Sequence, residues 1–315
     1  MGLRQNLDMV AVGNLNVDLI GKVKRLPMRD EKLLLKEFVR RPGGGAANFA
    51  VACSRLGLKS GLIGCVGEDE FGGDLLSNLR RENVDTTHIK VVDAPTGLVF
   101  ALSTLKGDHF LVAHRGANLS LKPADIDSDY IKGARLLHAS SVVPEVALAV
   151  GSRARKYGIQ TSLDLGAELV GVGRRKLLKI VELFDICFLN QRSYKNAFRK
   201  MPDKNGILKN FPRGLKVLVV TMGANGAMVT DGKRAVSAPT YKVKVRDSTG
   251  AGDAFAAAFD VIWMRSEVLE KALKYGLAEA AMKVQHVGAS EGLPTMKELE
   301  RFVRTRRQLS SGDLD

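Results

Sequence analysis

The chain lacks any apolar stretch long enough to cross a membrane. A spanning helix needs roughly 20 consecutive apolar residues, and the 315-residue sequence contains no such run. The first eight residues are polar and lead directly into the apolar residues 9–12, without the long apolar region or the cleavage site of a signal peptide. We therefore expect a cytosolic, that is cytoplasmic, protein that has no membrane partner.

Cysteine is also scarce. The chain has three cysteines, Cys53, Cys65 and Cys187, and none of them lies at metal-ligand spacing from another. An odd number of widely spaced cysteines argues against a disulfide framework. We interpret all three as small core residues. The five histidines lack metal-ligand spacing as well.

Aromatic residues make up only 6% of the chain, although its net charge is +14. A nucleic-acid groove interleaves aromatic and basic side chains, and the basic runs at 174–176 and 304–307 do not. The excess positive charge indicates a lysine- and arginine-rich surface, which has the secondary effect of attracting an anionic substrate such as ATP. We expect no nucleic-acid partner.

Four common motifs are missing: GxxxxGK[ST], a GxGxxG that opens a βαβ unit, HExxH and GxSxG. Their absence argues against a P-loop nucleotide hydrolase, a dinucleotide-binding enzyme, a zinc protease and an α/β-hydrolase.

Short apolar strands alternate with helices in the rest of the chain. Strands are predicted at 9–12, 61–66, 135–139, 160–165, 186–189 and 217–221, and helices at 46–56, 72–82, 145–157, 173–184, 191–200, 251–264 and 267–286. This alternation indicates a parallel sheet covered by helices on both faces.

Two extended insertions interrupt this pattern. Residues 21–41 and 97–116 are strand-like and carry no clear helix, and residues 106–108 form a plausible hairpin turn between strands at 97–104 and 109–114. We predict a β lid from these insertions, a catalytic core from residues 1–20, 42–96 and 117–315, and a frayed tail at 304–315.

The segment 247–255, Asp-Ser-Thr-Gly-Ala-Gly-Asp-Ala-Phe, is the sharpest chemical signal. We predict a strand at 243–245 before it and an alanine-rich helix after it. Gly250, Ala251 and Gly252 would present backbone N–H groups at the start of that helix, where anions bind. Asp253 then either stabilises the helix dipole or accepts a proton from a hydroxyl that attacks a phosphate.

Three weaker signals accompany it. The glycines 43–45 precede a helix that contains Asn48, and they suit either a small polar ligand or an ordinary loop. Asn14, Asn16 and Asp18 follow the first strand, where ligands of α/β proteins bind, although a local turn explains them as well. The segment 221–227 follows a buried strand and forms either a phosphate cradle or a hairpin.

Together these segments resemble the ribokinase family, also called the PfkB family of sugar kinases. Residues 247–255 are similar to its C-terminal signature and 43–57 to its N-terminal signature, and Thr96-Gly97, Gly116-Ala117-Asn118, 221–226 and Gly288-Ala289 occur in the expected order. The resemblance covers nearly the whole chain. It implies a ribokinase-like three-layer α/β/α sandwich with a central, mostly parallel sheet and a small β-sheet lid, which often forms a homodimer.

The resemblance also implies roles for individual residues. Asp253 is the catalytic base, and Gly250, Ala251 and Gly252 form the anion hole. The substrate-binding positions are Asn16, Asp18, Gly44, Gly45 and Asn48, and the nucleotide-binding positions are Asn190, Thr221, Gly223 and Gly226. ATP and Mg²⁺ are the expected cofactors, and Asp247 and Thr249 match a region where some members bind a monovalent cation, usually K⁺.

One position departs from the family pattern. An Asn-x-x-Glu motif commonly supplies a Glu that organises magnesium through water, and here the segment is Asn190-Gln191-Arg192-Ser193. The neutral and shorter Ser193 predicts weaker support for the metal.

The sequence leaves the acceptor open. A sugar or sugar-like kinase is the first hypothesis. A nucleoside kinase of the same family is the second, with Phe100, Phe110 and His114 as a platform for the base or as ordinary packing. A sensor that binds ligand without catalysis is the third.

Overall fold

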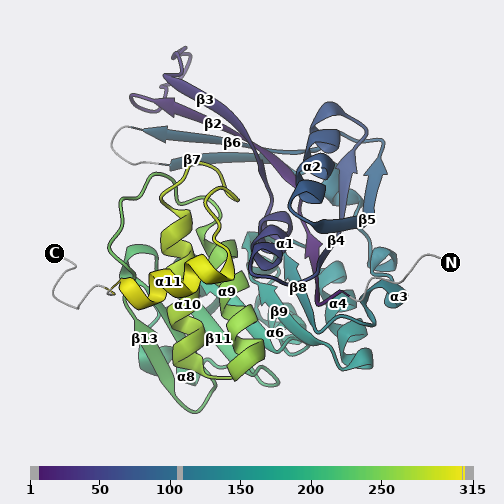
Figure 1. Cartoon of the computed structure of the whole chain (residues 1–315), viewed down its shortest axis with the longest axis vertical. Helices are drawn as coiled ribbons and strands as arrows, with labels where there is room; N and C mark the ends of the chain where they lie inside the picture. The colour runs from purple at the N-terminus through teal and green to yellow at the C-terminus, as the bar shows by residue number, and fades with distance from the viewer. Residues whose placement is uncertain (1–6, 105–108, 307, 309–315) are drawn as a thin grey trace.

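The computed structural model describes residues 7–104, 109–306 and 308 (Figure 1). Its main sheet contains nine strands in the order β13-β12-β11-β10-β9-β8-β1-β4-β5. Their bounds are β1 Met9–Gly13, β4 Ser60–Gly67, β5 Val84–Val92, β8 Leu136–Ser140, β9 Gln160–Asp164, β10 Ile186–Asn190, β11 Val217–Thr221, β12 Ala227–Thr230 and β13 Ala235–Ala238. The pairs from β5 to β11 are parallel, and the β11, β12 and β13 pairs are antiparallel.

Helices cover both faces of this sheet, as the strand-helix alternation predicts. The described residues contain the α-helices α1 Gly45–Arg55, α2 Glu70–Arg81, α3 Ser128–Ile131, α4 Pro144–Tyr157, α5 Ala167–Val170, α6 Arg174–Val181, α7 Gln191–Phe198, α8 Lys204–Lys209, α9 Ala251–Ser266, α10 Leu269–Lys283 and α11 Met296–Thr305. Together with the sheet they form a three-layer α/β/α sandwich, as predicted.

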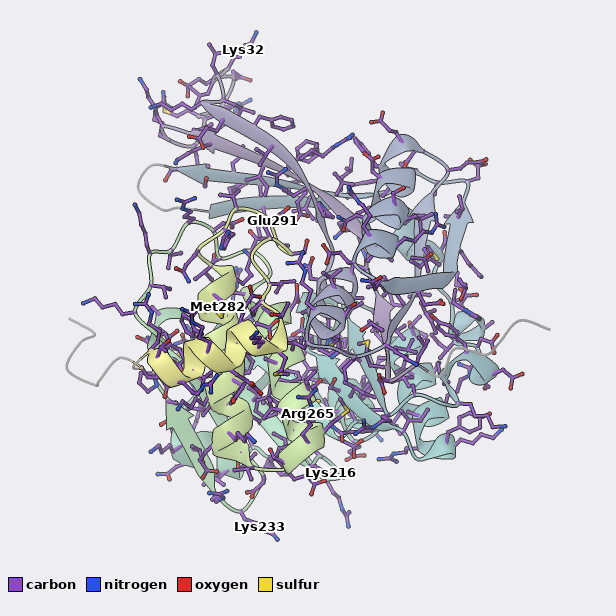
Figure 2. The ribbon with its side chains drawn as sticks, in the orientation of Figure 1. Lys32, Lys216, Lys233, Arg265, Met282 and Glu291 are labelled. Atoms are coloured by element: carbon purple, nitrogen blue, oxygen red, sulfur yellow. The ribbon has the colours of Figure 1, made fainter. Side chains whose placement is uncertain are left out.

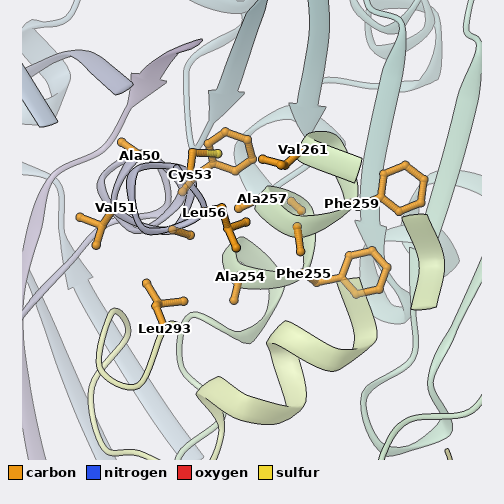
Figure 3. Packing of buried hydrophobic residues seen from close by; sticks show 14 of the residues in the cluster. Ala50, Val51, Cys53, Leu56, Ala254, Phe255, Ala257, Phe259, Val261 and Leu293 are labelled. Atoms are coloured by element: carbon orange, nitrogen blue, oxygen red, sulfur yellow. The ribbon is translucent and has the colours of Figure 1, made fainter. Parts of the chain in front are cut away.

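Alternating side chains of the central strands divide the interior into two cores, because successive residues of a strand point to opposite faces. Met9 and Ala11 pack in the core beneath α1, α9 and α10, whereas Val10 and Val12 pack in the core beneath α4 and α6. Figure 3 shows the first core, where Leu56, the C-cap residue of α1, lies between that helix and Ala254 and Ala257 of α9. This packing brings the N-terminal turns of α1 and α9 together.

A second sheet of four strands, in the order β3-β2-β6-β7, projects from the core at the top of Figure 1. Its strands are β2 Asn16–Val23, β3 Glu37–Gly43, β6 Gly97–Thr104 and β7 His109–His114. The small β lid is therefore present. The core and lid boundaries stay a prediction, and the hairpin turn at 106–108 lies outside the described residues.

The register of the small sheet gives it two distinct faces. Asp18 pairs with Arg41, and Ile20 with Ala101, on the face toward the core. The opposite face carries apolar side chains that are about half exposed. They are Phe38, Phe100, Phe110 and Val112.

Several sequence predictions need correction. Residues 243–245 form no strand; instead the N–H groups of Arg246 and Asp247 bind the carbonyl of Val284 at the end of α10. Only part of the strand-like insertion 21–41 is strand: β2 ends at Val23, and β3 begins at Glu37 and runs to Gly43. Strand β5, at the edge of the main sheet, was not anticipated. Helix α11 continues to Thr305, and Gln308 pairs with Tyr241. The frayed tail at 304–315 stays a prediction, and most of it lies outside the described residues.

Within residues 7–104, 109–306 and 308, no helix has both the length and the hydropathy that a membrane crossing demands. Lysines lie at both ends of the molecule in Figure 2: Lys32, between β2 and β3, at one end, and Lys216 and Lys233 at the other.

Candidate functional site

Five neighbouring parallel strands of the main sheet have a polar residue or a glycine at their carboxyl-terminal ends. Gly13 pairs with Ser140, Ser140 with Asp164, and Asn190 with Thr221, each at the carboxyl end of its strand. Because these strands are neighbours in the sheet, their ends form one continuous row. Ligands of open α/β sheets bind along such a row.

Asn48 and Asp253 meet above this row. Asn48 lies in the first turn of α1 and Asp253 in the first turn of α9, and the Asn48 Nδ2 atom donates a 2.7 Å hydrogen bond to Asp253 Oδ2. The contact joins the two segments that carry the family signatures. It orients the carboxylate and leaves the Oδ1 atom of Asp253 available to a ligand hydroxyl.

Burial raises the pKa of Asp253 to about 6. The Asn48 hydrogen bond and the charge of Lys283 act against this shift, whereas the nearby charge of Asp18 adds to it. Burial also raises the pKa of Asp18 to about 7, and the charge of Asp247 contributes. A carboxylate with a pKa near neutrality accepts a proton better than an ordinary aspartate.

The start of α9 has the form of an anion site. Gly250 is its N-cap residue with φ of 76°, and no side chain caps the helix. A Cβ atom on Gly250 would lie 2.3 Å from the carbonyl oxygen of Ala289, so both the conformation and the packing require glycine there. Gly252 faces open space, which lets a ligand approach the backbone N–H groups of this turn.

The predicted substrate residues gather beside Asp253. Asp18 is buried and fills the space that a side chain on Gly43 would take, since a Cβ atom there would lie 2.4 Å from Asp18 Oδ2. Asn48 follows Gly44 and Gly45, and its N–H group donates to the Gly44 carbonyl.

Asn16 is held by a residue outside the predicted site. Asn118 donates from Nδ2 to Asn16 Oδ1 at 2.8 Å and to the Leu15 carbonyl at 3.0 Å, and its Oδ1 accepts from the Leu15 N–H. The Gly116-Ala117-Asn118 motif thus positions Asn16.

The predicted nucleotide residues lie further along the strand-end row. Asn190 and Thr221 are register partners on β10 and β11, and Gly223 and Gly226 lie in the turn between β11 and β12. That turn also closes an antiparallel hairpin, so the hairpin and cradle interpretations are compatible.

Ser193 lies at the start of α7, where its N–H group donates to Asn190 Oδ1. Both residues line a cavity of about 760 Å³ together with Arg174, Arg192 and Arg199. Among the described residues that line this cavity there is no carboxylate. Its charge therefore suits the phosphates of a nucleotide, but it offers magnesium no anionic protein ligand.

Asp247 and Thr249, the candidate cation ligands, bind one another. The Asp247 Oδ1 atom accepts from Thr249 N at 2.9 Å and from Thr249 Oγ1 at 2.7 Å, and Oδ2 accepts from Gly288 N at 2.9 Å. Burial raises the pKa of Asp247, but these hydrogen bonds outweigh it, so the pKa lies below the usual range.

Two residues of the site were missed from the sequence. Asp164 ends β9, and burial together with the charge of Asp253 raises its pKa to about 7. Its place at a strand end was a usable signal. Lys283 ends α10, and its side chain is fully buried. No sequence signal marks it, because a lysine in a helix is typically at the surface.

A cleft of about 400 Å³ separates the small sheet from the segment that precedes α9. Three cationic side chains line it, from β2, β3 and the core segment. They are Lys22, Arg41 and Arg246, with Glu37 as the one acidic residue besides Asp247 among the described lining residues.

Comparison with known proteins is consistent across the chain. The sequence pattern of the pfkB family carbohydrate kinases matches residues 6–296. The ATP-dependent ribose-1-phosphate kinase of Halopiger xanaduensis is 29% identical over 299 residues, which cover 95% of this chain and 98% of that protein. The 5-dehydro-2-deoxygluconokinase of Geobacillus kaustophilus is 29% identical over 338 residues, covering 97% and 96%.

The fold has close solved counterparts. The crystal structure of ribokinase from Thermotoga maritima superposes with a TM-score of 0.83 at 26% identity, covering 95% of this chain and 100% of that one.

Proposed function

Since the chain belongs to the pfkB family of carbohydrate kinases and is an ATP-dependent kinase, we propose that it phosphorylates a sugar hydroxyl with Asp253 as the base. The observation that carries this proposal is the Asn48–Asp253 hydrogen bond at the N-terminus of α9. A base and an uncapped helix start lie within one turn of each other, as in-line phosphoryl transfer requires.

Asp253 has two tasks in this mechanism. Its free carboxylate oxygen accepts a hydrogen bond from the attacking hydroxyl and so orients it. As the bond from the hydroxyl oxygen to the γ-phosphorus forms, the bond from that phosphorus to the bridging oxygen breaks and ADP leaves. The same carboxylate takes the hydroxyl proton, which is favourable because its pKa is raised. The N–H groups of Gly250, Ala251 and Gly252 offset the charge that develops on the transferred phosphoryl group.

ATP enters this mechanism as its magnesium complex, and Mg²⁺ offsets negative charge on the phosphates. The chain's own contribution is the row formed by Asn190, Thr221, Gly223 and Gly226, together with the arginine-lined cavity beside Ser193. Because the described residues that line this cavity include no carboxylate, a bound Mg²⁺ would take its anionic ligands mainly from the phosphates.

The acceptor, we infer, carries an anionic group. Lys22, Arg41 and Arg246 line the cleft beside the acceptor residues. The Nε atom of Arg41 has no hydrogen-bond partner in the described part of the chain, and its ion pair with Glu291 is long, at 3.7 Å. The names of two relatives, a ribose-1-phosphate kinase and a 5-dehydro-2-deoxygluconokinase, describe a sugar phosphate and a sugar acid. Both substrates would place a negative charge where these cations lie.

The partner most consistent with the outer face of the small sheet is a second copy of the chain. Phe38, Phe100, Phe110 and Val112 expose apolar surface on this face, and β7 is an edge strand. Exposed apolar patches of this kind mark interaction surfaces. A homodimer would cover them and hold the lid in place.

An ATP-consumption assay with magnesium tests the proposed function. The acceptor panel contains pentoses, hexoses, sugar phosphates, keto-deoxy sugar acids and nucleosides. Turnover with an anionic sugar supports the whole proposal, and turnover only with a neutral sugar or a nucleoside contradicts the anionic acceptor. ATP binding without turnover on any acceptor contradicts catalysis and favours a ligand sensor.

A further inference from the structure

Lys283 is a buried ammonium group that the mechanism above does not use. It is the last residue of α10, and its side chain has no exposed surface. Its Nζ atom donates a 3.1 Å hydrogen bond to the backbone carbonyl of Asp247. Burying a charge is costly unless other groups compensate it, so the surroundings of Lys283 must supply that compensation.

Three carboxylates of the site act electrostatically on this ammonium group. Burial lowers the pKa of Lys283, but the charges of Asp247, Asp253 and Asp18 each favour its charged form, in that order, and Glu291 adds a smaller effect. The effect is mutual, because Lys283 also stabilises the ionised forms of Asp18, Asp247 and Asp253. The single positive charge of Lys283 thus stabilises the ionised forms of three acidic groups of the candidate site.

Lys283 also belongs to the support beneath the anion hole. Asp247 N–H binds the Val284 carbonyl, the Asp247 carbonyl accepts from Lys283, and Asp247 Oδ2 accepts from Gly288 N–H. Asp247 precedes Gly250 by one short turn, and Gly250 packs on Ala289. The segment 283–289 therefore fixes the position of the loop that starts α9.

This arrangement does not fit a monovalent cation bound to Asp247. Both carboxylate oxygens of Asp247 already accept hydrogen bonds from Thr249 and Gly288, and its carbonyl already accepts from an ammonium group. Because internal donors already occupy lone pairs of these oxygens, the oxygens would coordinate a K⁺ ion poorly. The like charge of Lys283 would also repel the ion.

We propose that the Lys283 ammonium replaces a monovalent cation as the positive charge beside the anion hole, and that the enzyme therefore works without K⁺. Lys283 is a positioning residue: it touches neither substrate, and it acts through Asp247 and the α9 start. The proposal rests on the kinase function for its rate effects, but it also predicts cation binding that is measurable without catalysis.

The test compares wild type, Lys283→Ala and Lys283→Met in KCl and in tetramethylammonium chloride at equal ionic strength. Wild type should turn over equally in both salts. Lys283→Ala should lose on the order of a hundredfold in rate without K⁺ and regain at least about tenfold with saturating K⁺, because the smaller side chain leaves space for the ion. Lys283→Met should lose rate and not respond, because it fills the space without a charge.

Thermal unfolding in the same salts separates this inference from the proposed function. K⁺ should raise the melting temperature of Lys283→Ala and leave wild type unchanged, since only a ligand that binds the folded state stabilises it. Saturable K⁺ activation or stabilisation of wild type would overturn the proposal and needs no variant. Full K⁺-free activity of Lys283→Ala, or its failure to respond to K⁺ in both assays, would overturn it too. An inactive wild type would contradict only the kinase function, and the thermal-unfolding comparison would still test whether Lys283 replaces a bound cation.

Discussion

Asn48 Nδ2 and Asp253 Oδ2 are 2.7 Å apart, although the two residues are separated by 205 positions in the sequence. The contact depends on the packing of α1 against α9 in the first core. Each helix has a glycine as its N-cap residue and no side-chain cap. The same helix pair thus positions the proposed base, the amide that orients it and the proposed anion hole.

The pH dependence of kcat/KM should report Asp253. Because burial raises its pKa to about 6 and the base must be ionised, kcat/KM should fall as the pH drops through about 6. Lys283 stabilises the ionised form, so Lys283→Met should move this acidic limb to higher pH. Lys274→Met, an exposed change on the same helix, is the control. A limb that stays in place in Lys283→Met argues against this electrostatic coupling.

Glu279 should make folding stability depend on pH. It is fully buried on α10, and neither carboxyl oxygen has a hydrogen-bond partner in the described part of the chain. Burial raises its pKa well above 4.5, so the folded state keeps a proton that the unfolded chain releases. Stability from this group is complete at low pH and declines as the pH rises above the unfolded pKa.

Glu279→Gln removes that dependence, because an amide has no proton to release. The melting temperature of this variant should exceed that of wild type at pH of about 8 and approach it at pH of about 4. Glu300→Gln, at an exposed position of α11, should change neither value. Equal destabilisation of Glu279→Gln at both pH values would show that the carboxyl group is not held protonated.

Ser193→Glu should lower the magnesium concentration needed for half-maximal rate, by about threefold to tenfold, because it adds a carboxylate beside the phosphate cavity. A magnesium titration at fixed ATP measures this, with Ser77→Glu on the exposed side of α2 as the control. An unchanged magnesium requirement would mean that Ser193 is no weakness of the metal site.

Phe100→Glu should convert a dimer into a monomer. The Phe100 side chain is 49% exposed on the outer face of the small sheet, and a charge there would be buried without a partner in the interface. Light scattering coupled to size exclusion gives the mass directly. Met201→Glu alters an equally exposed apolar residue outside this sheet and should have no effect. A monomeric wild type would refute the dimer.

Much of the fold was predictable because the central strands are short, continuously apolar and separated by helices. Strand β5 was missed because it mixes Thr, His and Lys with apolar residues, as an edge strand exposed on one side does. The alternation at 243–245 is typical of a strand, but that segment is fixed by hydrogen bonds from Arg246 and Asp247 to the end of α10. Local pattern does not reveal such tertiary contacts.

The same distinction applies to the site. Glycines and polar residues that follow strands or open helices mark the positions of Asp253, Asn48 and Asp18, because these local geometries have recognisable sequences. Lys283 is different. Its burial results from the packing of α10 against α9, and the carboxylates that favour its charge belong to other elements of the fold.

Asp253→Asn is the most direct test of the account, with ATP affinity and turnover measured on the same sample. Asparagine keeps the shape of the side chain but cannot accept the proton. The account predicts that kcat falls by roughly two to four powers of ten while ATP affinity and the melting temperature stay close to wild type. Asp129→Asn, an exposed change, should leave kcat unaltered. Near-normal turnover by Asp253→Asn would contradict the assignment of Asp253 as the base.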